Sequence, residues 1–125
     1  MKLLCTEQKN FSDEGKQLLT NYFDCNFIDV DSEQDLVNII ADYDILLVRF
    51  KLRLDKNILK KSKKLKYIIC PTTGLDHIDL VYVKELKIKL FSLKNQTSFL
   101  RKVPSTAELT VLLILALLRN FSFPP

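Results

Sequence analysis

Five short apolar runs, separated by helix-like stretches, are the feature that most restricts the fold of this 125-residue chain. The runs are rich in Leu, Ile and Val and lie at 2–5, 26–30, 44–48, 66–70 and 88–92. Strands that alternate with helices are typical of a parallel sheet with right-handed crossovers. The continuously apolar run at 44–48 is typical of a strand covered on both faces. We therefore predict an α/β fold with a flavodoxin-like, doubly wound, parallel five-stranded sheet.

The helices are expected between and after these runs. Ser12 or Asp13, Ser32 and Asp79 are good N-cap residues, and Pro104 suits the first position of a helix. These signals predict helices over 13–23, 32–41, 55–61, 79–85 and from 104 to about 120, with a polar loop at 93–103.

The last predicted helix is long and apolar on every side. Its segment 109–118 reads L-T-V-L-L-I-L-A-L-L. A surface helix shows a single apolar stripe, so this pattern predicts burial all round. A membrane span needs about 20 apolar residues, and this run is shorter. We therefore expect the helix to pack between the sheet and another domain or subunit.

Composition excludes several classes of function. Only two glycines are present, too few for a glycine-rich phosphate loop. The net charge of +4 is concentrated in the lysines of 60–66, with no interleaved stacking aromatics, so no nucleic acid partner is predicted. The three cysteines form no metal-binding spacing and suit a reducing, cytoplasmic compartment. No signal peptide or membrane segment is recognised, and no metal site is predicted.

The sharpest local motif follows the fourth run and reads P-T-T-G-L-D-H-I-D over 71–79. A turn of this kind can present successive backbone N–H groups to a carboxylate. The alternative is an ordinary strand-to-helix turn that needs Gly74 at positive φ. Arg49 ends the third run, at the same edge of the sheet, and could grip the same carboxylate. His77 is the only histidine and has no partner for a catalytic triad, so we predict a loop residue rather than a catalyst.

Three motifs in order resemble one family. They are Val48-Arg49 at a strand end, the stretch from Leu65 through the T-G-L-D-H-I-D-L segment of 73–80, and S-T-A-E-L-T at 105–110 leading into the apolar run that ends at Arg119. Together they resemble the D-isomer-specific 2-hydroxyacid dehydrogenases, a phosphoglycerate dehydrogenase-like family, in the N-terminal part of its substrate domain.

The resemblance implies a role for each matching residue. Arg49, Thr73, Gly74 and Leu75 match substrate-binding positions, with the carboxylate held by backbone amides of the 73–75 loop. Thr73, together with Thr106 and Ala107, matches positions beside the nicotinamide cofactor. The implied cofactor is NAD, and the choice between NAD and NADP stays open. The family's catalytic residues match no position here, so no catalytic residue is predicted.

The resemblance also implies a domain organisation. Residues 1–103 match the substrate-binding domain, 104–125 match an inter-domain or dimer helix, and the NAD-binding domain is expected to be absent. We therefore expect the chain to bind a small 2-hydroxy or 2-keto acid and to be inactive alone. Its expected partner is a second copy or the missing NAD-binding domain, contacted through 105–120. The alternative is a non-catalytic, flavodoxin-like dimerisation or interaction module.

Overall fold

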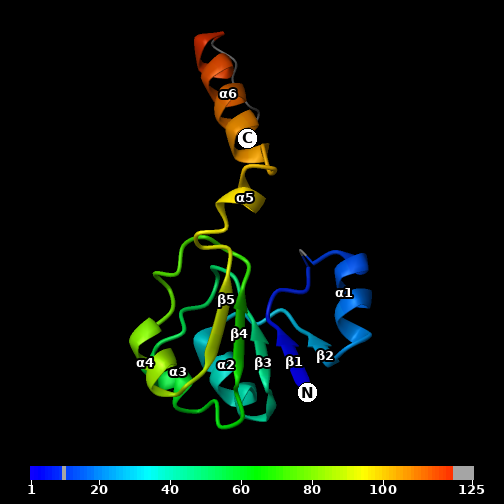
Figure 1. Ribbon diagram of the computed structural model, residues 1–125, viewed down its shortest axis with the longest axis vertical. Helices are drawn as coiled ribbons and strands as arrows, with labels where there is room; N and C mark the ends of the chain where they lie inside the picture. The colour runs from blue at the N-terminus through cyan, green and yellow to red at the C-terminus, as the bar shows by residue number, and fades with distance from the viewer. Residues whose placement is uncertain (10, 120–125) are drawn as a thin grey trace. The chain divides into compact units, whose positions relative to one another are not determined.

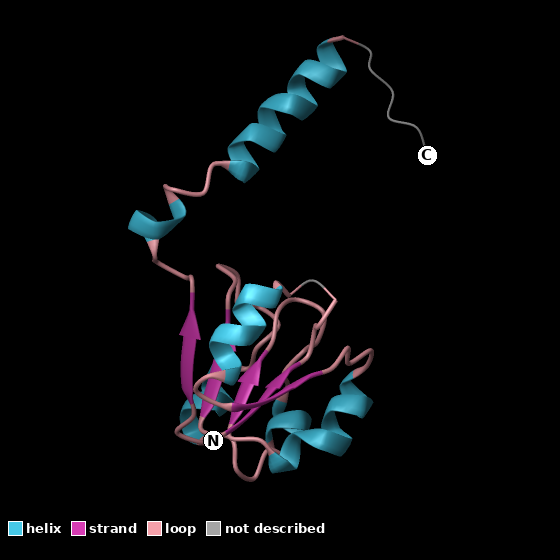
Figure 2. Ribbon diagram, turned by 90° about the vertical axis from the view of Figure 1, so that its right-hand side faces the viewer, coloured by secondary structure: helices cyan, strands magenta, loops and turns pink. Residues whose placement is uncertain are grey.

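The computed structural model describes residues 1–9 and 11–119, which fall into two compact units divided after Lys94. The first unit contains five parallel strands: β1 (Lys2–Cys5), β2 (Asp24–Phe27), β3 (Ile45–Leu47), β4 (Tyr67–Cys70) and β5 (Lys89–Ser92). Their order in the sheet is β2-β1-β3-β4-β5, and all arrows in Figure 2 point the same way. This is the flavodoxin-like order, with its switch point between β1 and β3. The predicted α/β class and parallel five-stranded sheet are confirmed.

Helices cover the sheet on two faces (Figure 1). On one face lies α1 (Asp13–Thr20), and on the other lie α2 (Glu33–Ile39), the 3-10 turn η1 (Ile40–Asp42), α3 (Lys56–Leu59) and α4 (Leu80–Glu85). Successive strand residues point to opposite faces. In β3, Leu46 belongs to the larger core cluster under α2 to α4, whereas Ile45 and Leu47 belong to the cluster under α1.

Side-chain caps begin the helices where the sequence predicts them. The hydroxyl of Ser12 accepts from the N–H of Gly15, and that of Ser32 accepts from the N–H of Asp35. The carboxylate of Asp79 accepts from the N–H of Tyr82. These bonds satisfy main-chain donors that the first helical turn leaves unpaired. Most elements are one to three residues shorter than predicted at their ends.

Two expectations about local structure were wrong. The second strand lies at Asp24–Phe27 rather than 26–30, because its pairing with β1 begins at Lys2 and Asp24. The segment 93–103 is not all loop, since it contains the short helix α5 (Thr97–Leu100).

The last helix, α6 (Ser105–Leu118), begins one residue later than expected. Its predicted end near 120 lies outside the described residues. Within 105–118 only Ala116 is buried in the single chain. The predicted burial of this helix against another domain or subunit stays a prediction.

Candidate functional site

The predicted substrate-binding residues of the first unit lie at the carboxyl edge of the sheet, where two neighbouring strands end. Arg49 comes two residues after β3, and the 73–75 loop comes shortly after β4. These strands pair directly, and the N–H of Val48 donates to the carbonyl of Ile69 at 3.0 Å. Paired strands lie about 4.8 Å apart. Arg49 and the loop therefore emerge side by side, at the edge where ligands of such sheets bind.

The loop offers main-chain donors that the protein itself does not use. Within the described residues, the N–H groups of Thr73, Gly74 and Leu75 donate to no protein acceptor, whereas the neighbouring Thr72 N–H is paired with the carbonyl of Cys70. Thr73 is exposed, Gly74 is half-buried and Leu75 is buried. Successive free N–H groups of this kind can form a concavity that binds anions.

The alternative interpretation, an ordinary strand-to-helix turn, requires a positive φ at Gly74. The φ of Gly74 is not positive. A Cβ built on Gly74 would meet Phe50 Cε1 at 3.8 Å, which is an ordinary contact. Neither backbone strain nor protein packing therefore requires glycine at this position.

Arg49 is held by an ion pair with a residue that follows β1. Its Nη1 lies 3.8 Å from Oε2 of Glu7, and the two side chains are 41% and 17% exposed. The other carboxylate oxygen of Glu7 is buried without a hydrogen-bond partner among the described residues. The long ion pair leaves N–H donors of the Arg49 guanidinium free to meet a carboxylate.

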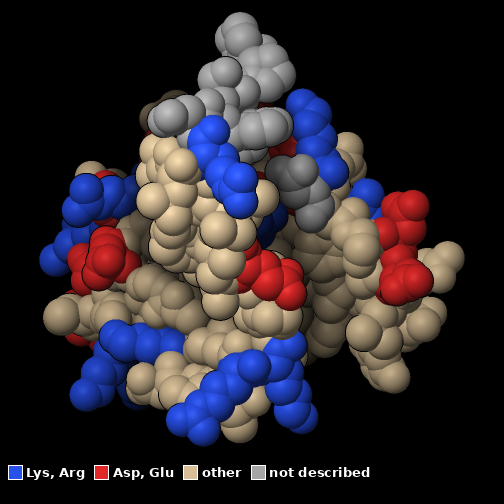
Figure 3. Space-filling view, turned by 90° about the horizontal axis from the view of Figure 1, so that it is seen from above, with Lys and Arg blue, Asp and Glu red and all other residues tan. Residues whose placement is uncertain are grey.

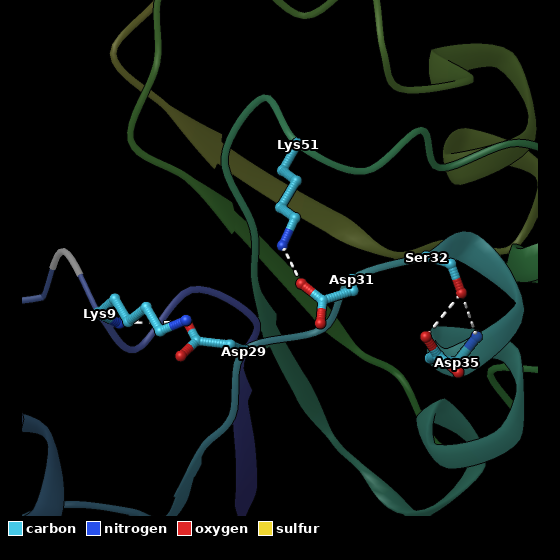
Figure 4. A network of polar contacts seen from close by, with 6 residues as sticks. All are labelled: Lys9, Asp29, Asp31, Ser32, Asp35 and Lys51. Carbon is cyan, nitrogen blue, oxygen red and sulfur yellow. Dashed lines mark hydrogen bonds and ion pairs between the residues drawn. The ribbon is translucent and has the colours of Figure 1, made fainter.

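The segment that carries Arg49 is fixed from one side by the β2–α2 loop. Figure 4 shows the Lys51 ammonium against the carboxylate of Asp31, at 2.6 Å. This bond lowers the pKa of Asp31 and raises the pKa of Lys51. The N–H of Arg53 donates to Glu33, which lowers the pKa of that carboxyl.

The same segment is fixed from the other side by the turn after β4. The N–H of Leu54 donates to the carbonyl of His77 at 2.8 Å, and the N–H of Asp79 donates to the carbonyl of Leu54 at 2.9 Å. These two bonds form an isolated parallel bridge between Leu54 and Ile78. The Arg49 segment and the 73–79 turn are therefore held as one piece.

A compact polar cluster lies directly beneath the loop. The Cys70 thiol is 3.0 Å from the Thr72 hydroxyl and 3.5 Å from Nε2 of His77. The imidazole also packs against the Phe50 ring, with centroids 5.5 Å apart. Burial raises the pKa of the Cys70 thiol, which favours the protonated form. His77 lies in the turn after β4, as predicted, and its ring is held by Cys70 and Phe50. That it is not a catalyst stays a prediction.

A hollow of about 410 Å³ opens beside the loop. Leu75 and His77 contribute to its wall, together with Arg53 and Lys94, but Arg49, Thr73 and Gly74 do not. Arg49 and two of the three residues with free amides therefore lie next to this hollow, whereas Leu75 belongs to its wall.

Thr106 and Ala107, the other predicted cofactor-binding residues, lie in the first turn of α6, in the second unit. The carbonyl of Thr106 accepts from the Thr110 hydroxyl at 2.8 Å. Their role beside a cofactor stays a prediction.

We looked for a metal site, a membrane-spanning helix and a patch of like charge among residues 1–9 and 11–119. No group of three or more metal-ligating side chains occurs there, and no helix of that part is long and apolar enough to cross a membrane. On the face drawn in Figure 3, Lys and Arg side chains are interspersed with Asp and Glu. Within the lysine-rich stretch, Lys64 pairs with Asp42 at 3.7 Å and Lys66 with Asp44 at 3.9 Å.

Sequence reasoning missed three contributors to this edge: Glu7, Thr72 and Phe50. Glu7 stands two residues after β1, so the rule that ligands gather at the carboxyl ends of strands could have selected it. Thr72 stands two residues after β4, so the same rule applies to it. The contacts that make Thr72 and Phe50 important, with Gly74 and His77 respectively, are created only by the folded loop.

The fold and this edge define a parallel α/β domain that gathers an arginine and unpaired main-chain amides beside its central strands. The family model of the D-isomer specific 2-hydroxyacid dehydrogenase, catalytic domain, matches residues 3–110. The chain belongs to this family, whose members use NAD as cofactor.

Individual relatives agree with this assignment. The chain is 34% identical over 110 residues to hydroxypyruvate reductase of Thermotoga maritima, a match that covers 87% of this chain and 34% of the relative. It is 33% identical over 125 residues to formate dehydrogenase of Candida boidinii, covering 94% of this chain and 32% of that enzyme. The chain thus spans about a third of the length of these curated relatives.

Solved structures show the same fold. A protein of Pyrococcus horikoshii superposes with a TM-score of 0.72 at 26% identity, covering 95% of this chain and 34% of that protein. A protein of Thermus thermophilus gives a TM-score of 0.76 at 23% identity, covering 93% and 36% respectively.

Proposed function

We propose that residues 1–103 form the substrate-binding part of an NAD-dependent oxidoreductase that acts on the CH–OH group of 2-hydroxy acids. The three unpaired N–H groups of Thr73, Gly74 and Leu75 carry this proposal. They would hold the substrate carboxylate, and the Arg49 guanidinium would pair with the same group from the neighbouring strand end. An anion held by several preorganised donors is fixed in position as well as bound.

The cofactor would supply the hydride, and this chain would supply orientation for the acid. Thr73, Thr106 and Ala107 are the residues proposed to lie beside the nicotinamide of NAD, or of NADP if the enzyme uses it. A solved structure with the same fold, an acyclic imino acid reductase, is described in complex with NADPH and D-Arg.

Binding of D-lactate tests the substrate site. Titration of the chain followed by ¹H–¹⁵N NMR should shift the amides of Thr73, Gly74 and Leu75. Arg49→Ala should weaken D-lactate binding roughly tenfold to a hundredfold, because a charge-assisted hydrogen bond contributes about 1.5–3 kcal/mol. The affinity of Arg49→Lys for D-lactate should lie between that of the unaltered chain and that of Arg49→Ala, because an ammonium keeps the charge but loses the bidentate geometry.

Arg53→Ala is the matched control, because Arg53 is an exposed arginine four residues further along the same segment. It should bind D-lactate as the unaltered chain does. The proposed site would be contradicted if D-lactate shifted only the amides of other residues. It would also be contradicted if Arg49→Ala and Arg53→Ala lost the same affinity for D-lactate.

We further propose that this chain alone does not transfer hydride, because it spans only a third of the relatives' length. The purified chain with NADH and a series of 2-keto acids should show no loss of absorbance at the NADH maximum. Steady oxidation of NADH that depends on the keto acid would overturn this proposal.

A second candidate function is a non-catalytic dimerisation or interaction module, favoured by the exposed leucines of α6. The two proposals are compatible, because segment 105–120 could contact either a second copy or an NAD-binding domain. The oligomeric state of the chain in solution tests this interface.

A further inference from the structure

Thr72 is the buried residue between β4 and the 73–75 loop, with only 5% of its surface exposed. Four contacts converge on it. Its N–H donates to the carbonyl of Cys70 at 2.7 Å, and its carbonyl accepts from the N–H of Leu93 at 3.1 Å. Its hydroxyl donates to the carbonyl of Gly74 at 2.8 Å and lies 3.0 Å from the Cys70 thiol. Thr72 is therefore fixed at both main-chain groups and at its side chain.

The directions of the side-chain hydrogen bonds follow from the proton count. A carbonyl only accepts, so the single hydroxyl proton of Thr72 is used on Gly74. The hydroxyl oxygen must then accept from the Cys70 S–H. Since that proton is also used, the Cys70 sulfur can only accept from Nε2–H of His77. The result is a chain of donors from His77 through Cys70 and Thr72 to Gly74, and such chains reinforce each bond in them.

The last bond sets the direction of a loop amide. The described residues contain no cis peptide bond, so the Gly74 carbonyl and the Leu75 N–H point in opposite directions across one planar unit. Because the buried Thr72 hydroxyl draws the carbonyl toward the protein, the Leu75 N–H is directed away from Thr72. This amide is one of the three that donate to no described acceptor.

The far end of the donor chain is anchored too. The His77 ring packs against Phe50, and the His77 carbonyl accepts from Leu54 of the Arg49 segment. The cluster therefore links the loop that presents the amides to the segment that presents the arginine.

We propose that Thr72 is a positioning residue for the carboxylate-binding loop, orienting the Gly74–Leu75 peptide through a hydrogen-bond chain that begins at His77 and passes through Cys70. The proposal rests on the proposed function for the identity of the ligand. The orientation of the peptide itself stands on the contacts alone.

Two variants separate the hydroxyl from the shape of the side chain. Thr72→Val replaces the hydroxyl by a methyl group of similar size, and Thr72→Ser keeps the hydroxyl. D-lactate is the ligand probe, and the ¹³C resonance of the Gly74 carbonyl reports the hydrogen bond directly. A carbonyl that loses its donor moves to higher field.

Thr72→Val is expected to move the Gly74 carbonyl resonance to higher field and to weaken D-lactate binding about three- to tenfold. Thr72→Ser should return the Gly74 carbonyl resonance to its position in the unaltered chain. Its affinity for D-lactate should lie within about twofold of that of the unaltered chain. A merely structural role would lower stability in both variants without this rescue.

If the Gly74 carbonyl resonance of Thr72→Val does not move, the proposal is overturned. It is also overturned if the resonance moves but Thr72→Val binds D-lactate as tightly as the unaltered chain does. If the unaltered chain binds no D-lactate while the resonance moves as expected, the proposed function fails and the peptide orientation is supported. Should Thr72→Val not fold, Thr72→Ala removes the same hydroxyl donor to the Gly74 carbonyl. A Gly74 resonance that stays in place in Thr72→Ala would then overturn the proposal.

Discussion

Replacing Leu46 by alanine is expected to lower the free energy of unfolding by about 2–5 kcal/mol, the usual cost of removing a large buried side chain. Leu46 is fully buried in β3, where it pairs with Leu4 of β1 and Ile68 of β4. The two neighbours are also fully buried. The surrounding strands cannot close on the cavity without breaking their own hydrogen bonds, so little of the loss is recovered.

Urea unfolding followed by far-UV circular dichroism measures the effect. Domains of this size are stable by about 5–15 kcal/mol in total, so the loss removes a large share of the stability. Leu18→Ala is the matched control, because Leu18 lies on α1 and is 60% exposed. It should change the free energy of unfolding by less than about 0.5 kcal/mol. Equal losses at the two positions would contradict the assigned core.

The sheet could be predicted from the sequence because its information is local. Four strands, β1, β3, β4 and β5, lie within the predicted apolar runs. Each predicted cap at Ser12, Ser32 and Asp79 makes the expected main-chain bond. Strand order was also within reach, since alternating strands and helices with right-handed crossovers allow few arrangements. Strand ends were less predictable, because pairing partners and not composition decide where β2 begins.

The site could be predicted only in outline. The position of the 73–75 loop follows from the end of β4, but its three unpaired amides depend on how the backbone turns at Thr72. Gly74 shows the limit well. A glycine after a strand suggests positive φ, yet here its φ is not positive and a Cβ would fit against Phe50. Likewise Arg49 was expected at this edge, whereas its partner Glu7 comes from 42 positions earlier in the chain and is found only in the fold.

For helix α6, the apolar composition predicts that the helix is buried, but it does not identify the surface that covers it. Leu109, Leu112 and Leu115 are 54%, 54% and 53% exposed, and Val111 is 56% exposed. Monomeric soluble proteins rarely expose contiguous apolar surface of this extent, and such patches mark interaction sites. The interface proposed through 105–120 accounts for the apolar composition without requiring a contact inside the chain.

Charges placed on one face of α6 should therefore abolish self-association. Leu112 and Leu115 lie three positions apart, on one side of the helix, next to Val111 and Glu108. Burying a leucine contributes about 1.5–3 kcal/mol, and the helices of two copies would each bury several. The unaltered chain should associate at micromolar concentration, which corresponds to about 8 kcal/mol.

The double variant Leu112→Glu, Leu115→Glu should elute and scatter light as a monomer of 14.5 kDa, because burying two carboxylates in an apolar contact costs more than the contact supplies. A control with Leu18→Glu and Val81→Glu adds the same charge at exposed apolar positions of α1 and α4. That control should associate as the unaltered chain does. A monomeric unaltered chain that binds no apolar dye would contradict the interface, and an associated double variant would place it on another surface.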